Sequence, residues 1–324
     1  MELIFKKLSQ ISAGLLFVIL AATTVVLYLS AKPAIEAFGV GFLFETRWGV
    51  EEQLLVDGAT EKLDVVESAA LDDLDGEDFI DDDDFISDDD DESGASGTRE
   101  IYGALVPIVG TIFSTLIAML FSIPIAMGIA VFLSEIAASS IAKPVGVAIE
   151  LLASIPSIIY GMWGLFYFGP FIASIFGGNT VSLLVAGLVL AIMVIPFMAA
   201  LSRDAISTVP DMLKESAYAM GATKLEVIKD VVFPYAKSGI IGSIILSFGR
   251  AMGETMAVAF VIGGIYQFAG KVTDPTNSIP VVLANSFAES SGLSLSVLFY
   301  LALILFIMSF IVIGVAKFYF LRRK

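Results

Sequence analysis

The chain has 324 residues, of which 57% are hydrophobic, and it contains neither cysteine nor histidine. This composition exceeds the apolar share of an ordinary soluble domain, and it excludes disulfides, thiolate or histidine metal sites, and cysteine- or histidine-dependent nucleophiles. The formal net charge of −16 is local, because residues 57–92 hold eighteen Asp and Glu against one Lys, which leaves +1 for the rest.

Several apolar runs approach or exceed the roughly 20 residues that a helix needs to cross a hydrocarbon core. The sequence therefore predicts an all-α membrane protein with six transmembrane helices, near residues 11–30, 104–133, 147–170, 180–201, 239–264 and 293–316. The first run follows Lys6 and Lys7. Its length, and the poor cleavage context of Lys32-Pro33, favour an uncleaved anchor over a signal peptide.

Positively charged residues predict the orientation of these spans. With the N-terminus inside, twelve Lys and Arg fall in cytoplasmic pieces and five fall outside. Because cytoplasmic loops carry the excess of Lys and Arg, both termini are expected on the cytoplasmic side. We expect the chain to be a multi-pass protein of a bacterial or archaeal plasma (inner) membrane. Residues 31–103 and 265–292 are then outside.

The predicted organisation is an anchor, an extracytoplasmic segment, a membrane core with one long cytoplasmic loop, and a basic tail. These occupy residues 1–30, 31–103, 104–317 (with the loop at 202–238) and 318–324. Within the extracytoplasmic segment, an insert at about 51–98 combines low hydrophobicity with dense like charge, which predicts disorder. Weak divalent-cation binding and a specific docking site are the alternatives for this insert.

The cytoplasmic loop reads as two short amphipathic helices. Gly221 suits the C-terminal cap of the first helix, and Thr223 suits the N-cap of the second, with Glu226 completing a capping box. Pro234 is expected to close the unit before the next span. By periodicity alone, an interfacial helix pair lying on the lipid surface is a sufficient interpretation.

The loop also resembles a pattern of bacterial ABC importer permeases, E-A-A-x3-G-x9-I-x-L-P. The spacing is kept by Glu215, Ser216, Ala217, Gly221 and Pro234, with Ser216 replacing an alanine, Val231 an isoleucine and Phe233 a leucine. In that family the loop docks in a groove of a separate ATPase subunit. The resemblance implies that Glu215, Ala217 and Gly221 lie at this contact.

Three further segments, 150–166, 191–210 and 249–264, look like the phosphate-specific ABC permeases, in particular the C-type subunit. The resemblance implies a type I importer permease fold and a path for inorganic phosphate. It also implies three partners: a second permease subunit, a dimer of ATP-binding subunits and an extracytoplasmic phosphate-binding protein. A permease for sulfate or molybdate and a non-transporting, phosphate-responsive scaffold are the alternatives.

The chain is not expected to be an enzyme. A phosphate-binding loop needs G-x-x-x-x-G-K-[ST], and the nearest text, residues 263–272, does not keep this spacing. ATP and Mg are therefore expected on the partner ATPase, and no cofactor or metal is expected in this chain. Because a scaffold does not need an ATPase-docking element, the kept spacing of the loop motif argues against the scaffold.

Two charges interrupt the predicted fifth span. Arg250 and Glu254 fall on one helical stripe with Ser243 and Ser247, and an ionised side chain facing lipid at this depth costs at least ~2.5 kcal/mol. The stripe is either a structural Arg–Glu pair or a polar path. In a path, the planar guanidinium of Arg250 offers two donors to a phosphate, and Glu254 holds the arginine in place. The family resemblance favours the path.

Small residues form a neighbouring stripe on the same predicted helix. Gly249, Gly253 and Ala257 make a small-xxx-small pattern that suits close approach of another helix. At the inner end of the fourth span, Arg203 and Asp204 are further candidates for the path, with a snorkelling interface pair as the alternative. Glu150 is expected to be an interface residue.

Overall fold

A computed structural model describes residues 2–53 and 98–321 of the protein, with side chains over 5–50 and 100–318. The chain divides into two compact units, one formed by Gly49–Ile101 and the other by Met1–Trp48 with Tyr102–Lys324. The acidic stretch 57–92, and the disorder, cation binding or docking considered for it, lie outside the described residues.

The larger unit is helical, and six of its helices are long and apolar enough to cross a membrane. They are Phe5–Leu43, Leu105–Ile136, Ser157–Phe176, Leu183–Ser207, Lys224–Met252 and Gly292–Phe318. The predicted all-α class with six spans is therefore confirmed for the described residues.

Several of these spans consist of more than one helical element. In the first half of the chain the elements are α1 (Glu2–Phe38), the 3-10 helix η1 (Gly39–Leu43), α2 (Leu105–Val131), the π turn η2 (Phe132–Ile136), α3 (Ser139–Ala153), α4 (Ser157–Trp163), the π turn η3 (Gly164–Phe168) and α5 (Gly169–Phe176). In the second half they are α6 (Leu183–Ser207), α7 (Asp211–Ala219), α8 (Lys224–Glu226), the π turn η4 (Val227–Val232), α9 (Phe233–Met252), α10 (Met256–Ala259), α11 (Ile279–Ser286) and α12 (Gly292–Leu321).

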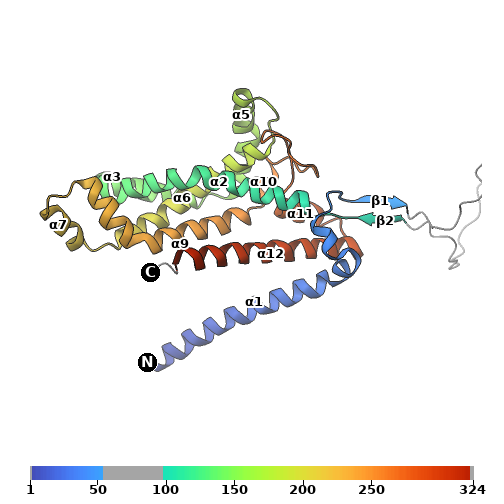
Figure 1. Ribbon diagram of the computed structural model, residues 1–324, viewed down its shortest axis with the longest axis horizontal. Coiled ribbons are helices and arrows are strands. Elements are labelled where there is room, and N and C mark those ends of the chain that lie inside the picture. Colours follow the sequence, from blue (N-terminus) through green and yellow to red (C-terminus); the bar gives the residue numbers. More distant parts are fainter. Residues whose placement is uncertain (1, 54–97, 322–324) are drawn as a thin grey trace, which may run out of the picture. The chain divides into compact units, whose positions relative to one another are not determined.

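The centre of the larger unit is the packing of α2 along α6 (Figure 1). The buried face of α2 is built from small residues at helical spacing: Thr111, Ser114, Thr115, Ala118, Ser122, Ala126 and Ala130. Small side chains let the two backbones approach closely, which is the main source of attraction between helices in lipid. Helix α9 packs on the same α6, so α6 lies in the middle of the unit.

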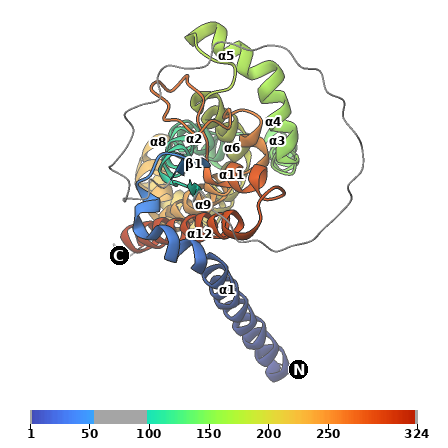
Figure 2. The ribbon, with the colours of Figure 1, turned by 90° about the vertical axis from the view of Figure 1, so that its right-hand side faces the viewer.

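Helix α1 packs along α12 near its C-terminal end only. Ala31 and Ala34 are fully buried there, whereas large apolar side chains from Phe5 to Leu20 are exposed. Figure 2 shows the first part of α1 extending away from the other helices. In Figure 1, the start of α1, the end of α12 and α7 lie at the same end of this unit, as an even number of spans requires.

The smaller unit is an antiparallel ribbon of β1 (Val50–Gln53) and β2 (Thr98–Ile101), paired from Val50↔Ile101 to Gln53↔Thr98. In the larger unit, the two chain positions that flank this excursion meet. The rings of Trp48 and Tyr102 lie 5.2 Å apart, edge to face. The larger unit is thus closed at the point where the chain leaves it and returns.

The third predicted span, 147–170, differs from the structure. The chain breaks between α3 and α4 at Ser154–Pro156, and the membrane-length helix begins at Ser157. Proline disfavours helical geometry in the residue before it and has no N–H to continue the ladder. The apolar run was continuous in sequence, but the helix is not.

The fifth predicted span, 239–264, was wrong at both ends. The helical run extends from Lys224 to Met252 and ends before Gly253. Pro234 was expected to separate the loop from the span, but the helix passes through it. The π turn η4 ends at Val232, two residues before this proline, and it relaxes the α-helical register that a proline would otherwise break.

Candidate functional site

One face of α9 carries polar groups toward α6. The hydroxyls of Ser243 and Ser202 lie 2.6 Å apart and are buried. One turn further along α9, the Ser247 hydroxyl is buried and has no hydrogen-bond partner among the described residues. The predicted stripe therefore does run along α9, from Ser243 to its last turn.

Arg250 ends this stripe in the last turn of α9. Its guanidinium carbon lies 5.0 Å from the centre of the Phe197 ring on α6, which is a cation–π contact. The side chain is exposed, and among the described residues no carboxylate forms an ion pair with it. A guanidinium held by a ring face keeps its in-plane N–H donors available, which is the geometry that receives an oxyanion.

Glu254 does not extend the stripe, because α9 ends at Met252. Its carboxylate instead accepts the backbone N–H of Ala257 at 3.3 Å, at the start of the short helix α10. The expected contact of Glu254 with Arg250 is not formed in the part of the chain that the structure describes. The cause is the break at Gly253, which removes the one-turn separation that a continuous helix would have given the two charges.

The three small residues of the neighbouring predicted stripe fall in three different surroundings. A Cβ at Gly249 would lie 3.0 Å from Ile313 Cδ1, so this glycine lies against α12. A Cβ at Gly253 would have only the carbonyls of its own chain segment nearby, the closer at 3.7 Å. Ala257 is fully buried in α10, where its backbone lies beside Gly161 of α4. Close helix approach thus occurs at the first and third positions.

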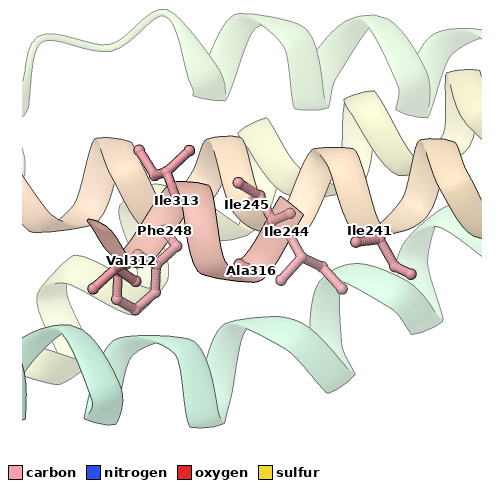
Figure 3. A pocket seen from close by; sticks show the side chains of 7 residues that line it. All are labelled: Ile241, Ile244, Ile245, Phe248, Val312, Ile313 and Ala316. Atoms are coloured by element: carbon pink, nitrogen blue, oxygen red, sulfur yellow. The ribbon is translucent and has the colours of Figure 1, made fainter. Parts of the chain in front are cut away.

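A groove of about 250 Å³ lies between α9 and α12 (Figure 3). It is lined by Ile241, Ile244, Ile245, Phe248, Val312, Ile313 and Ala316. Every one of these side chains is a hydrocarbon, so the groove offers no donor to an oxyanion. The polar face of α9 that bears Arg250 is the more suitable place for a charged substrate.

Arg203, near the C-terminal end of α6, differs from Arg250 in that carboxylates surround it. Its guanidinium donates to Glu150 of α3 at 2.7 Å and to Asp204 at 3.2 Å. Two carboxylates therefore compensate its charge, and the contact ties α3 to α6. Gly146 leaves the room for this side chain, because a Cβ there would overlap the guanidinium. Glu150, expected at an interface, is one member of this ion-pair cluster.

The predicted caps of the loop are confirmed. Gly221 has a φ of +88°, and the bonds from Gly221 N–H to Tyr218 O and from Ala222 N–H to Ala217 O form a Schellman motif. Thr223 and Glu226 make the reciprocal capping box. The two caps fix the turn between α7 and α8, and so fix which side of α7 faces outward.

The outward side of α7 carries part of the motif together with exposed apolar residues. Glu215 and Ser216 are exposed, as is Pro234 beyond the loop. Met212 and Met220 are 72% and 84% exposed. Ala217, by contrast, is buried in an apolar cluster with residues of α2, α6 and α9. Its side chain therefore faces the permease core, and the surface it was expected to share is left to Glu215 and its exposed neighbours.

Several residues of this site carry no signal in the sequence. Phe197 is one of 25 phenylalanines, and only its distance to Arg250 distinguishes it. Lys214 was counted only as an inner positive charge, yet it forms a 2.6 Å ion pair with Glu135 of η2. Contacts between residues this far apart in the chain depend on how the helices pack, which periodicity does not reveal.

Comparison with known proteins agrees with this arrangement. The family described as "Binding-protein-dependent transport system inner membrane component" matches residues 101–323. A phosphate transport system permease protein PstC of Pasteurella multocida is 37% identical, over 99% of this chain and 92% of its own length. The PstC protein of Xylella fastidiosa is 48% identical, over 68% of this chain and 74% of its own length.

A solved structure shares the fold. An inward-facing form of the MetNI methionine ABC transporter aligns with a TM-score of 0.53 and 20% identity, over 65% of this chain and 91% of that one. The fold is therefore that of an ABC importer permease. The chain belongs to the family of binding-protein-dependent transport system inner membrane components and, within it, to the PstC family of phosphate transport system permease proteins.

Proposed function

We propose that this chain forms part of the path for inorganic phosphate in an ATP-driven importer. The observation that carries the proposal is its similarity to phosphate permeases along almost its whole length, at 37% identity over 99% of the chain. Arg250 supports it, because its guanidinium is exposed, lies against Phe197 and forms no ion pair in the described chain. Passage requires binding that is weak enough to reverse, and one arginine provides this.

The energy for transport comes from partner subunits. The outward side of α7, with Glu215, Ser216 and exposed Met212 and Met220, is the surface that would dock on an ATPase dimer. ATP and Mg bind there, in the partner. A second permease subunit completes the path, and an extracytoplasmic phosphate-binding protein delivers the substrate on the side of residues 265–292.

The orientation follows from the charge distribution. The twelve Lys and Arg of the predicted inner pieces include those around α7, and the start of α1 and the end of α12 lie at the same end of the unit (Figure 1). Both features support an orientation with the two termini and α7 in the cytoplasm. Arg203, Glu150 and Asp204 then lie toward the inner end of the path.

Phosphate uptake by cells that lack the native permease tests this proposal. Arg250→Gln should abolish concentrative uptake while the complex still assembles, and Arg250→Lys should be clearly impaired, because an ammonium cannot offer two coplanar donors. Arg47→Gln, at another exposed arginine, is the matched control. Full uptake by Arg250→Gln would contradict the path role. Inhibition of uptake by sulfate or molybdate, but not by excess phosphate, would contradict the substrate.

Docking on the ATPase is tested separately. Glu215→Arg should reduce the amount of ATPase subunit that copurifies with the permease, because it reverses an exposed charge on the docking surface. Undiminished copurification would move the docking surface away from α7.

A further inference from the structure

Lys214 directly precedes Glu215, the first residue of the loop motif, but is less exposed than Glu215. It is the neighbour of Glu215 in α7, yet its side chain is only 16% exposed. Its ammonium lies 2.6 Å from the carboxylate of Glu135, whose side chain is 7% exposed. Asp211, one turn earlier, is 3.8 Å from the same ammonium but is itself 88% exposed. The buried partner of Lys214 is therefore Glu135.

Glu135 occupies a special place at the end of α2. It lies in the π turn η2, which is closed by the bond from Ala137 N–H to Phe132 O at 2.7 Å. A π turn adds one residue to the helical register and so rotates the following side chains by about 100°. Such turns are frequent at functional sites. Glu135, within this turn at the end of α2, is the residue that reaches Lys214 of α7.

The ion pair thus connects two elements with different tasks. Helix α7 bears the proposed ATPase-docking surface, and α2 packs along α6 over most of its length. Helix α6 in turn carries Phe197, on which Arg250 lies. Apolar contacts in the cluster that contains Ala217 hold α7 to α2, α6, η4 and α9, but they are non-directional. The Lys214–Glu135 contact is charged, buried and directional.

We propose that the Lys214–Glu135 pair is the positioning contact through which movement of α7 is transmitted to α2, and that the pair stays closed throughout the transport cycle. This inference rests on the proposed function, since it assumes that an ATPase moves α7. A buried pair is costly to open, because separation leaves each charge desolvated and uncompensated. A contact that does not open during the cycle is what a mechanical link requires.

Substitutions of the adjacent residues Lys214 and Glu215 are expected to have different effects. With the reconstituted complex of permease, ATPase and binding protein, we expect Lys214→Met and Glu135→Gln to copurify normal amounts of ATPase. Phosphate transported per ATP hydrolysed should fall at least about tenfold, which is the factor that one charge-assisted hydrogen bond typically carries. Glu215→Arg should instead lower copurification. Lys229→Met and Asp230→Asn, at exposed charges of η4, are matched controls that should leave the ratio unchanged.

The exchange variant Lys214→Glu with Glu135→Lys should restore at least half of the parent ratio, which a merely space-filling role would not. An unchanged ratio in both single variants would overturn the proposal, as would an exchange variant that assembles and recovers nothing. If the parent complex itself neither binds ATPase nor transports phosphate, the proposed function has failed instead.

A second measurement, by cross-linking, covers the case in which the charge variants do not assemble. The chain has no native cysteine, so Glu135→Cys with Lys214→Cys introduces its only two thiols, which a short bis-maleimide linker can join. Without the linker this variant lacks the ion pair, so we expect its uptake to be low. Cross-linking should raise that uptake, because the linker replaces a contact that stays closed. Uptake that stays the same or falls further after complete cross-linking would show that a closed link does not transmit the movement, and would overturn the proposal.

Discussion

The contact between α4 and α10 offers a sharp test of the packing beside Glu254. Gly161 of α4 lies so close to α10 that an added Cβ would be 2.9 Å from both Cα and O of Ala257, and 2.9 Å from Phe260 Cδ2. Ordinary contacts begin at 3.4 Å, so Gly161→Ala forces a shift of 0.5 Å. Two of the three opposing atoms are backbone and cannot turn away.

The expected cost follows from two opposing effects. Overpacking of this kind costs roughly 1–3 kcal/mol, and alanine in place of a helical glycine returns about 0.5–1 kcal/mol. We therefore expect Gly161→Ala to lower the free energy of unfolding by about 1 kcal/mol. Gly128→Ala in α2 is the matched control, because a Cβ there meets nothing within 4 Å. Gly128→Ala should raise the free energy of unfolding by about 0.7 kcal/mol, since only the helix propensity changes.

The assay is the thermal unfolding midpoint of the purified complex in detergent, with the two variants and the parent measured side by side. For a chain of this size a difference of ~2 kcal/mol corresponds to a few degrees. The same substitution should move the midpoint in opposite directions at the two sites. Equal midpoints for Gly161→Ala and Gly128→Ala would refute the reasoning from close contact.

Three further predictions follow from local features. Replacing residues 54–97 by Asn-Gly should leave assembly and uptake intact, because Gln53↔Thr98 is the last ribbon pair and a two-residue turn closes it; loss of assembly would contradict this. Thr223→Ala should cost about 1 kcal/mol of stability by removing the capping box, measured against Thr208→Ala. Burial raises the pKa of Tyr266, so stability should fall as pH rises above about 10, where the unfolded tyrosine ionises first. Tyr266→Phe should reduce that fall, and the difference between the tyrosinate absorbance titrations of the parent and this variant reports the raised pKa.

Much of the fold could be predicted from local sequence. Apolar run length indicated six spans because each helix must satisfy its backbone within the bilayer. The caps at Gly221 and Thr223 were also predictable, because both depend on residues within one turn of each other. Where a structure is decided by neighbouring residues, the printed sequence contains the information.

The ends of helices inside apolar runs were not predictable in this way. Hydropathy does not distinguish a continuous span from one that stops at Gly253 and restarts at Met256. That break depends on Glu254 accepting the Ala257 N–H and on α10 lying against α4, which are tertiary contacts. The relation of Arg250 to Glu254 therefore could not be deduced from their spacing of four, although the position of Arg250 on the same helical stripe as Ser243 and Ser247 could.

The meeting of Trp48 and Tyr102 has a consequence for how this protein can change over evolution. Because the bundle is closed there by its own rings, and by the bond from Ala104 N–H to Phe42 O at 2.8 Å, whatever lies between these positions is not needed to complete it. Sequence can be gained, lost or exchanged at this point under selection separate from that acting on the helices. The same position should accept a fluorescent domain or an affinity tag, which makes it a natural attachment point for following the permease in living cells.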